Sequence, residues 1–372
     1  MNKIAIIGAG KTGRGFIGRL LWEAGKEFIF VDKNRELVEE LRREGVFPVH
    51  FFGRCRETMT VKGFRAYTWE DEETAAALAA CDLIFVSVGG TNLPAVGAEL
   101  KKRLSADKPY AVITCENASK PSKTLSDAIG LDNVRVSEAT VFCTTNDGGR
   151  GTDGAPLAIH SENYPYLQCD ADLLGELADG INIPQIRTIH CFGNFLTRKL
   201  FTYNAASGII AYMGWLYGYS DYSAAANDER ILALLDRNYA VTNRVLCAEF
   251  GYDPDDQAEF ALLSKKKFTD RTISDTISRN AREPQRKLLP AERVIGPLTV
   301  IARHGEDTSV LEMTAAAMLL YDAQEEDAWR EIKAEKTPRE ILRDICGLPD
   351  DHPSVERILS YRDEFEKAIP GR

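Results

Sequence analysis

The first segment that could do chemistry lies near the start of the chain, IAIIGAGKTGRGFIG (4–18). It contains two overlapping patterns that bind phosphate in proteins. The tripeptide Gly-Lys-Thr (10–12) could end an ATP-binding loop, whereas the three glycines of GAGKTG (8–13) have the spacing of a dinucleotide-binding turn. An ATP-binding loop needs a glycine five positions before its Gly-Lys-Thr, and Ala5 stands there. The spacing therefore excludes the ATP-binding loop and leaves the dinucleotide turn.

The residues around the glycines complete the dinucleotide pattern. A strand is predicted at Ile4–Ile7, and apolar residues at helical spacing follow the turn, namely Phe16, Leu20 and Leu21. In such a turn the first glycine allows the tight bend and the second lets the backbone approach the pyrophosphate. The third glycine lets helix and strand pack closely, and the helix N-terminus stabilises negative charge. We therefore expect the cofactor to be bound by Gly8, Gly10, Lys11, Thr12 and Gly13.

The choice between the two nicotinamide cofactors depends on the end of the second predicted strand. That strand, EFIFV (27–31), is followed by Asp32. An acid there accepts hydrogen bonds from the adenosine ribose and favours NAD over NADP. Lys33 and Arg35 could instead accommodate the extra phosphate of NADP, or they could be the solvated start of a helix.

Composition narrows the class of protein. The chain has 372 residues, 44% of them hydrophobic and 27% charged, which is typical of a globular protein of two domains. A net charge of −10 disfavours nucleic-acid binding, and no apolar run approaches the roughly 20 residues that span a bilayer. The eight cysteines form no C-x-x-C and the five histidines are scattered. We expect buried free thiols in a reducing cytoplasm, no metal site and a small-molecule partner; the oligomeric state is not predicted.

The first half of the chain alternates predicted strands with predicted helices, which indicates a doubly wound, mostly parallel sheet of the Rossmann type. The exception is 46–69, expected to be an extended hairpin insertion. Ligands bind beyond the carboxyl ends of such strands, so Gly89, Glu116 and Asn117 are expected near the cofactor. The expected elements are helices at 35–45, 73–80, 93–104 and 122–130, and strands at 81–90, 110–117 and 133–145.

From about residue 190 the pattern becomes helical and no convincing strand follows. This change predicts a dinucleotide-binding domain at 1–190 and a mostly α-helical substrate domain at 191–372, with a cleft between two such domains as a natural substrate site. The expected helices are 193–217, 228–250, 255–264, 308–323 and 325–345.

A second segment with chemical potential is RKLFTYNAASGIIAYMG (198–214), which has the spacing K-x4-N-x2-S. It resembles the K-x4-N-x2-H signature of the polyol-specific long-chain dehydrogenases, the mannitol dehydrogenase family. The segments ITCEN (113–117) and ISDTISRNAREPQRKLLPAERVIGPL (273–298) are similar to that family as well. The resemblance covers nearly the whole chain and is closest to the mannitol-1-phosphate branch.

The resemblance implies roles for particular residues. Lys199 matches the family's general base, and Asn204 and Asn117 match the amides that hydrogen-bond the reacting oxygen. A lysine has an ordinary pKa of about 10.4, so we expect burial and neighbouring cations to lower it. We take Arg198 and Arg286 to be those cations.

Other residues leave two interpretations open. Arg286 and Lys287 could hold a substrate phosphate or carboxylate, or they could form structural ion pairs with nearby acids. The aromatic run 212–222 could pack in the core or form a sugar platform. The lysines of 264–268 could be a solvated face or could bind phosphate.

Two departures from the family put the substrate in question. Ser207 stands where the signature has histidine, and Val141 and Phe142 stand where the family has an Asp-Arg pair. We expect an NAD-dependent oxidoreductase acting on a sugar alcohol or keto-sugar, with mannitol 1-phosphate and fructose 6-phosphate as the best single pair. The alternatives are a non-catalytic dinucleotide-binding regulator or sensor, and a different enzyme on the same scaffold, such as a hexuronate-type reductase or an amino or hydroxy acid dehydrogenase.

Overall fold

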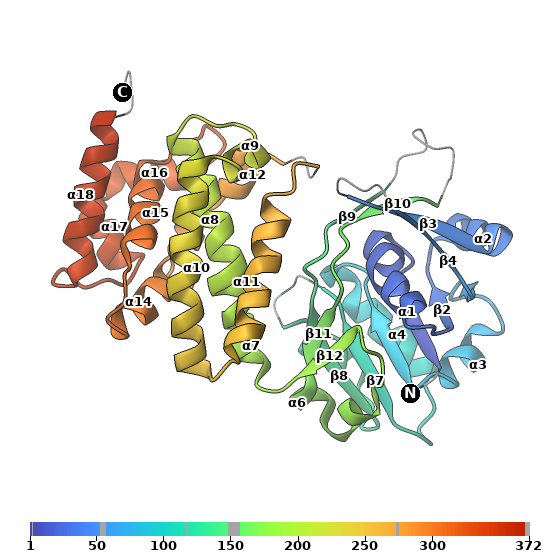
Figure 1. The fold of residues 1–372 in the computed structure, drawn as a ribbon. Helices are drawn as coiled ribbons and strands as arrows, with labels where there is room; N and C mark the ends of the chain where they lie inside the picture. Colours follow the sequence, from blue (N-terminus) through green and yellow to red (C-terminus); the bar gives the residue numbers. More distant parts are fainter. Residues whose placement is uncertain are drawn as a thin grey trace. The chain divides into compact units, whose positions relative to one another are not determined.

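The chain folds into two compact units, Met1–Gly193 and Asn194–Arg372, in a computed structural model. The structure describes residues 1, 3–52, 57–116, 118, 120–147, 157–272 and 275–368. Within these residues the first unit combines sheets with helices, and the second unit is built from helices (Figure 1).

The first unit is organised around an eight-stranded sheet with the order β12-β11-β8-β7-β6-β1-β2-β5. All neighbouring strands are parallel except β8 and β11. The sheet is therefore doubly wound and mostly parallel, as predicted. The strands are β1 (Ile4–Ile7), β2 (Phe28–Val31), β5 (Phe64–Tyr67), β6 (Leu83–Val86), β7 (Tyr110–Thr114), β8 (Val134–Thr140), β11 (Leu167–Asp170) and β12 (Ile186–Ile189).

Four neighbouring strands of the sheet, β2, β1, β6 and β7, are buried at every position. Their sequences are continuous apolar runs, because helices cover both faces of a parallel sheet and neither face meets water. The strand order reverses between β1 and β6, and ligands bind at the carboxyl ends of strands where such a reversal opens a crevice. The helices up to β8 are η1 (Gly13–Gly18, a π-helix), α1 (Arg19–Glu23), α2 (Arg35–Glu44), α3 (Thr74–Ala79), η2 (Gly90–Asn92, a 3-10 helix), α4 (Leu93–Arg103) and α5 (Pro121–Ile129).

The predicted hairpin insertion at 46–69 is right for its first part only. Strands β3 (Val46–Phe51) and β4 (Thr58–Lys62) form an antiparallel pair in a small second sheet. The following residues were placed wrongly, since β5 joins the main sheet beside β2. Gly63, with φ of 78°, turns the chain, and the Phe64 ring then packs against the aromatic rings of Phe28 and Phe30. Burial of this aromatic cluster outweighs continuation of the hairpin.

Several short elements between 145 and 190 are not evident from the sequence. The small sheet is completed by β9 (Thr145–Asp147) and β10 (Ile159–Ser161), and β11 and β12 extend the main sheet beyond β8. The helices here are α6 (Ala171–Leu174) and the 3-10 helix η3 (Gly175–Gly180). Strands of three or four residues have too few positions to show a period in sequence.

The second unit is a helical assembly whose core lies around α8 and α15, two helices that are buried over most of their length (Figure 1). Its helices are α7 (Phe192–Lys199), η4 (Leu200–Asn204, a π-helix), α8 (Ala205–Leu216), α9 (Tyr222–Ala226), α10 (Glu229–Phe250), α11 (Pro254–Phe268), α12 (Ile277–Ala281), α13 (Pro284–Lys287), α14 (Ile295–Arg303), α15 (Ser309–Leu320), α16 (Asp327–Glu335), α17 (Pro338–Asp344) and α18 (Pro353–Ala368).

Two expectations for the second unit are settled by local contacts. The helix predicted at 325–345 is two helices, because Thr337 and Glu340 form a capping box that begins α17 with Pro338 in its first turn. The aromatic run 212–222 packs in the core: the Tyr212 hydroxyl donates to the Ala281 carbonyl at 2.9 Å, and the rings of Tyr212 and Trp215 pack against Tyr321.

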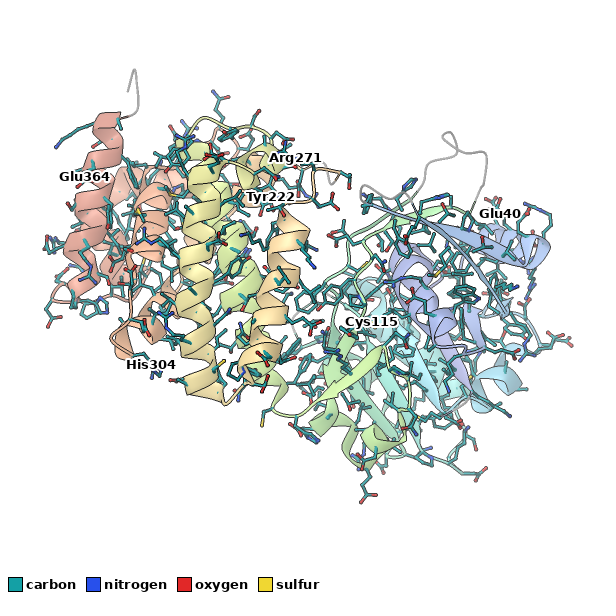
Figure 2. The ribbon with its side chains drawn as sticks, viewed as in Figure 1. Glu40, Cys115, Tyr222, Arg271, His304 and Glu364 are labelled. Atoms are coloured by element: carbon teal, nitrogen blue, oxygen red, sulfur yellow. The ribbon has the colours of Figure 1, made fainter. Side chains whose placement is uncertain are left out.

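The described cysteines are all free thiols, and most are buried, although Cys191 is exposed and Cys247 is partly exposed. Cys115 lies directly after β7 inside the first unit (Figure 2), and burial raises the pKa of its thiol. No group of three or more His, Cys, Asp or Glu suited to a metal ion occurs among the described residues. None of the helices in the described part of the chain has both the length and the apolar character that crossing a bilayer requires.

Candidate active site

The glycine turn has a distinct packing environment at each glycine. A Cβ on Gly8 would lie 2.1 Å from the Ser87 carbonyl oxygen, and a Cβ on Gly13 would lie 1.9 Å from the Gly8 carbonyl oxygen. A Cβ on Gly10 would meet no atom within 4 Å. The outer two glycines are therefore required by the packing of the protein itself. The middle one borders open space, as a residue must where backbone approaches a ligand.

Asp32, which lies directly after β2, is hydrogen-bonded to the same turn. One carboxylate oxygen accepts the Ala9 N–H at 2.7 Å, and the other accepts the Asn34 N–H at 2.8 Å. Gly8 itself donates to the Val31 carbonyl at 2.8 Å. Asp32 thus holds the turn in place. Each of its carboxylate oxygens keeps a lone pair that can accept a further hydrogen bond.

A cavity of about 640 Å³ starts at the turn and runs past Asp32 towards α4. Its far wall carries Trp69, which follows β5, and Arg103 of α4. The Arg103 guanidinium lies 5.1 Å from the centre of the Trp69 ring and donates to the Trp69 carbonyl at 2.7 Å. Neither residue was predicted from the sequence, although Trp69 lies just beyond the carboxyl end of a strand, where ligand contacts are expected. The remaining lining residues include Val31, Lys33, Glu70, Val96 and Glu99.

The predicted cofactor residues are not all placed alike. Gly8, Gly10 and Asp32 line this cavity, whereas Lys11, Thr12, Gly13, Gly89 and Glu116 are not part of its lining. Glu116 has a role in the adjoining loop instead: one carboxylate oxygen accepts the Val88 N–H at 2.6 Å and the Gly89 N–H at 2.8 Å. Burial raises the pKa of Glu116, and these two amides oppose the increase. Asn117 lies outside the described residues.

In the second unit, Lys199 ends α7, Asn204 ends the π-helical turn η4, and Ser207 lies in the first turn of α8. From Phe201 to Gly214, a stretch that the structure describes in full, Asn204 and Ser207 are the two positions that are not fully buried. Lys199 is partly buried as well. Three polar side chains are therefore partly accessible to solvent on one helical segment that is otherwise mostly buried.

The pKa of Lys199 is lowered, first by burial and then by the positive charges of Lys267 and Arg293. The direction is the one expected for a base, but the cations differ from those predicted. Arg198 faces α11, where it pairs with Asp256 at 2.7 Å, and Arg286 pairs with acids of its own segment. Neighbours in sequence point to different sides of a helix, so adjacency to Lys199 was a poor guide.

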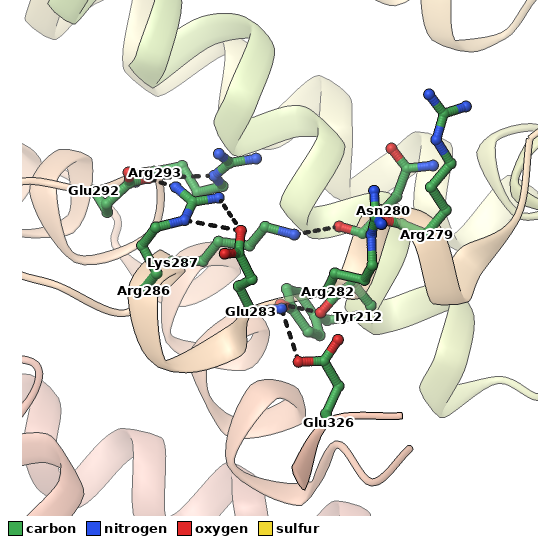
Figure 3. Close-up of polar contacts among 11 residues, drawn as sticks. Tyr212, Arg279, Asn280, Arg282, Glu283, Arg286, Lys287, Glu292, Arg293 and Glu326 are labelled. Carbon is green, nitrogen blue, oxygen red and sulfur yellow. Dashed lines mark hydrogen bonds and ion pairs between the residues drawn. The ribbon is translucent and has the colours of Figure 1, made fainter. Parts of the chain in front are cut away.

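A polar cavity of about 660 Å³ in the second unit is lined by the segment 279–293 together with Asp275, Glu325 and Glu326. Arg286 is held by Glu283 at 2.9 Å and by Glu292 at 3.0 Å (Figure 3). Of the two interpretations of Arg286, the structure therefore shows the ion pairs.

Lys287 has a different environment in the same cavity. Its side chain is buried and its ammonium donates to the Asn280 carbonyl at 2.6 Å (Figure 3). Burial, reinforced by Arg293 and Arg286, lowers its pKa to about 7. The charge of Arg293 thus lowers the pKa of both Lys287 and Lys199, which are distant from each other in sequence.

The backbone at this cavity is strained. Glu283 has φ of 57°, a left-handed conformation that is unfavourable for a residue with a Cβ. Its N–H donates to the Glu326 carboxylate at 3.0 Å (Figure 3), which holds the strained residue in place. Such strain clusters at functional sites.

The apolar replacement of the family's Asp-Arg pair is visible in the first unit. Phe142 is buried and its ring stacks on Tyr164 with the centroids 5.1 Å apart, and Val141 is partly buried. The nearby Glu138 accepts a hydrogen bond from the Ser122 hydroxyl at 2.7 Å. The side chains at 141 and 142 therefore offer no polar contact.

Comparison with known proteins identifies the family. The chain matches the mannitol dehydrogenase Rossmann domain over residues 2–144 and the mannitol dehydrogenase C-terminal domain over residues 192–370. It is 30% identical to mannitol-1-phosphate 5-dehydrogenase of Brevibacillus brevis, covering 94% of each chain, and 28% identical to the enzyme of that name from an Arthrobacter species, covering 99% of each.

Solved structures agree in fold. A D-sorbitol dehydrogenase superposes with a TM-score of 0.72 over 98% of this chain and 93% of its own, at 14% identity. Mannitol 2-dehydrogenase of Pseudomonas fluorescens, solved with NAD and D-mannitol, gives a TM-score of 0.61 over 99% of this chain and 91% of its own, also at 14% identity. The fold is that of a two-part protein with a Rossmann domain and a helical C-terminal domain, as in these dehydrogenases. The chain belongs to the mannitol dehydrogenase family.

Proposed function

We propose that the protein is an NAD-dependent dehydrogenase that interconverts a sugar alcohol and a keto-sugar, with mannitol 1-phosphate and fructose 6-phosphate as the substrate pair. Two relatives that match over nearly their whole length are named mannitol-1-phosphate 5-dehydrogenases. The observation that carries the proposal is Lys199, a partly buried lysine with a lowered pKa, presented with Asn204 and Ser207 from one helical segment.

NAD is the cofactor. The glycine turn offers its open Gly10 to the pyrophosphate, and Asp32 accepts hydrogen bonds from the adenosine ribose. The carboxylate would repel the extra phosphate of NADP. Trp69 forms the wall of the cavity beyond Asp32, where a flat aromatic ring can stack on the adenine. When bound, the nicotinamide accepts or returns the hydride.

Residues of the chain itself transfer the proton. In oxidation, the neutral Lys199 amine takes the proton of the substrate hydroxyl while the hydride leaves the carbon that bears this hydroxyl. The products are the ketone and an ammonium at Lys199. In reduction, the ammonium returns that proton to the oxygen. Burial, together with the charges of Lys267 and Arg293, favours the neutral amine and so brings the pKa of the Lys199 base closer to neutral pH. The Asn204 amide donates to the oxygen while negative charge develops on it, and we assign the same role to Asn117.

The other residues adapt the site to its substrate. The Ser207 hydroxyl replaces an imidazole and can still donate to, or accept from, a sugar hydroxyl. Lys287 and the arginines of the polar cavity supply positive charge for the substrate's phosphate. Since Arg286 is held by two acids, we assign the larger part of this role to Lys287.

Two features favour a second candidate, a dinucleotide-binding regulator without catalysis. These are Ser207 in place of the signature histidine and the apolar Phe142 in place of a charged pair. Such a protein would keep the first unit's cofactor cavity and lose turnover.

The test is NADH oxidation by the purified protein with fructose 6-phosphate, fructose, fructuronate and tagaturonate, beside Lys199→Ala. Turnover of fructose 6-phosphate that collapses in the variant supports the proposal. Turnover of fructuronate or tagaturonate alone would instead indicate a hexuronate reductase. NADH binding without turnover of any substrate would favour the regulator.

A further inference from the structure

The helical segment that carries Lys199 is not a uniform α-helix. Between α7 and α8 the five residues Leu200–Asn204 form a π-helical turn, in which the Ala205 N–H donates to the Leu200 carbonyl five residues earlier. An α-helix bonds to the residue four earlier, so this turn holds one extra residue. Such turns are rare in proteins and occur often at functional sites.

The extra residue changes which side chains share a face. In a regular α-helix, residues five apart point about 140° away from each other. A π turn is wider, with about 4.4 residues per turn, so residues five apart are only roughly 50° from each other and Lys199 and Asn204 lie on one side of the helix. Ser207 follows three residues later within α8, and residues three apart are neighbours on an α-helix. The burial pattern agrees, since Asn204 and Ser207 are the positions between 201 and 214 that escape full burial.

We infer that the π turn aligns Lys199, Asn204 and Ser207, and that Gln257 is the positioning residue that holds this turn in shape. The inference rests on the proposed function, because it gives the alignment a purpose in hydride transfer. Gln257 lies in α11 and is fully buried.

Gln257 binds the helical segment on both sides of Lys199. Its amide oxygen accepts the Arg198 Nε–H at 2.6 Å, and its amide nitrogen donates to the Thr202 hydroxyl inside the π turn at 3.3 Å. The same nitrogen donates to Asn243 of α10 at 2.8 Å. One side chain therefore fixes the residue before Lys199 and a residue within the turn, and anchors both to a third helix.

The Arg198 end of this network is held firmly. Its guanidinium donates to the Asp256 carbonyl at 2.9 Å and lies 4.2 Å from the centre of the Phe260 ring and 4.5 Å from that of Tyr252. Removing the Gln257 amide would leave buried polar groups without partners, and the π turn could then relax to α-helical bonding. That relaxation would rotate Lys199 away from Asn204 and towards solvent.

The experiment follows Lys199 directly, with no substrate needed. Acetic anhydride reacts with neutral amines, so labelling at a series of pH values, read by peptide mass spectrometry, gives the titration midpoint of each lysine. The full-length wild type is compared with Gln257→Met and Thr202→Val. Gln168→Met is the matched control, since Gln168 is also a buried glutamine and donates to the Tyr164 hydroxyl at 3.1 Å in the first unit.

We expect the Lys199 midpoint to lie below those of exposed lysines in the wild type and in Gln168→Met. In Gln257→Met it moves up towards them, and kcat falls about 10- to 100-fold with unchanged affinity for NADH. Thr202→Val shifts both quantities in the same direction by less. Should Gln257→Met fail to fold, Thr202→Val decides alone.

An unchanged Lys199 midpoint and kcat in both variants would overturn the inference. Failure of the proposed function gives a different result: Lys199→Ala would then retain wild-type turnover, or no substrate would turn over, while the labelling still reports whether Gln257 positions the lysine.

Discussion

The cofactor cavity of the first unit and the lysine face of the second unit are specified in different ways. The glycine turn at the cavity is specified by backbone contacts, since a Cβ on Gly8 or Gly13 would collide with a carbonyl oxygen. The lysine face is built from side chains whose environment comes from remote segments, such as Arg293 and Lys267 acting on Lys199. A backbone site leaves a compact pattern in the sequence, whereas a side-chain site is defined mostly by tertiary packing.

The largest effect is expected where a single side chain carries the chemistry. Lys199→Ala removes the proposed base, so kcat should fall about 10²- to 10⁴-fold while NADH binding is kept. Steady-state kinetics and a fluorescence titration with NADH measure the two quantities. Lys266→Ala is the control, since Lys266 is exposed on the same unit. If Lys199→Ala were as active as Lys266→Ala, Lys199 would not be the base.

The next prediction separates two glycines of the backbone site. Gly13→Ala places a Cβ 1.9 Å from the Gly8 carbonyl oxygen, so it should destabilise the fold by about 1–3 kcal/mol and abolish NADH binding. Gly10→Ala meets no protein atom and should keep the wild-type Tm while weakening NADH binding about tenfold, because the methyl group would occupy ligand space. Thermal unfolding with NADH titration decides, and a lowered Tm in Gly10→Ala would contradict the assignment of that space to the ligand.

Cofactor choice should depend on Asp32 by a smaller factor than turnover depends on Lys199. Asp32→Ala removes an acceptor of the ribose hydroxyl and the charge that opposes NADP, so the ratio of NADH to NADPH affinity should fall about 10- to 100-fold. Glu36→Ala, an exposed acid in the first turn of α2, is the control. If the ratio stays at the wild-type value in Asp32→Ala, another residue sets the preference.

The smallest effect concerns Lys287 and stability. Its pKa of about 7 in the folded chain lies below the value of roughly 10.4 for an unfolded lysine. The folded chain therefore binds fewer protons between these values, and stability gains from Lys287 as the pH rises through this window. Below pH 7 the buried ammonium destabilises the fold. The Tm of the wild type minus that of Lys287→Met should rise between pH 6 and pH 9; a difference independent of pH would mean that burial does not perturb this lysine.

The contrast also explains what the sequence could predict. The strand, turn, helix and acid from Ile4 to Asp32 lie within one short segment, so their spacing could predict the Rossmann fold and propose a cofactor site beside it. The short strands β11 and β12 and the placement of Phe64 in the main sheet depended on partners far along the chain, and local patterns could not show them.

The second unit shows the same limit at the level of side chains. Arg198 lies next to Lys199 in sequence but bonds to α11, whereas Arg293 is 94 residues away and acts on the lysine. One signal was available: Lys199, Asn204 and Ser207 are spaced by five and then three residues within an apolar run. A five-residue step between polar positions is wrong for one face of an α-helix and is typical of a π turn.

The two hydrogen bonds that Asp32 accepts from the backbone also affect how cofactor preference could change by mutation. The carboxylate that would meet the ribose already holds the Ala9 N–H at 2.7 Å. A lineage drifting towards the other cofactor would lose the support of its own phosphate loop with the first substitution at this position. Cofactor preference and the shape of the phosphate loop therefore depend on the same side chain in this chain.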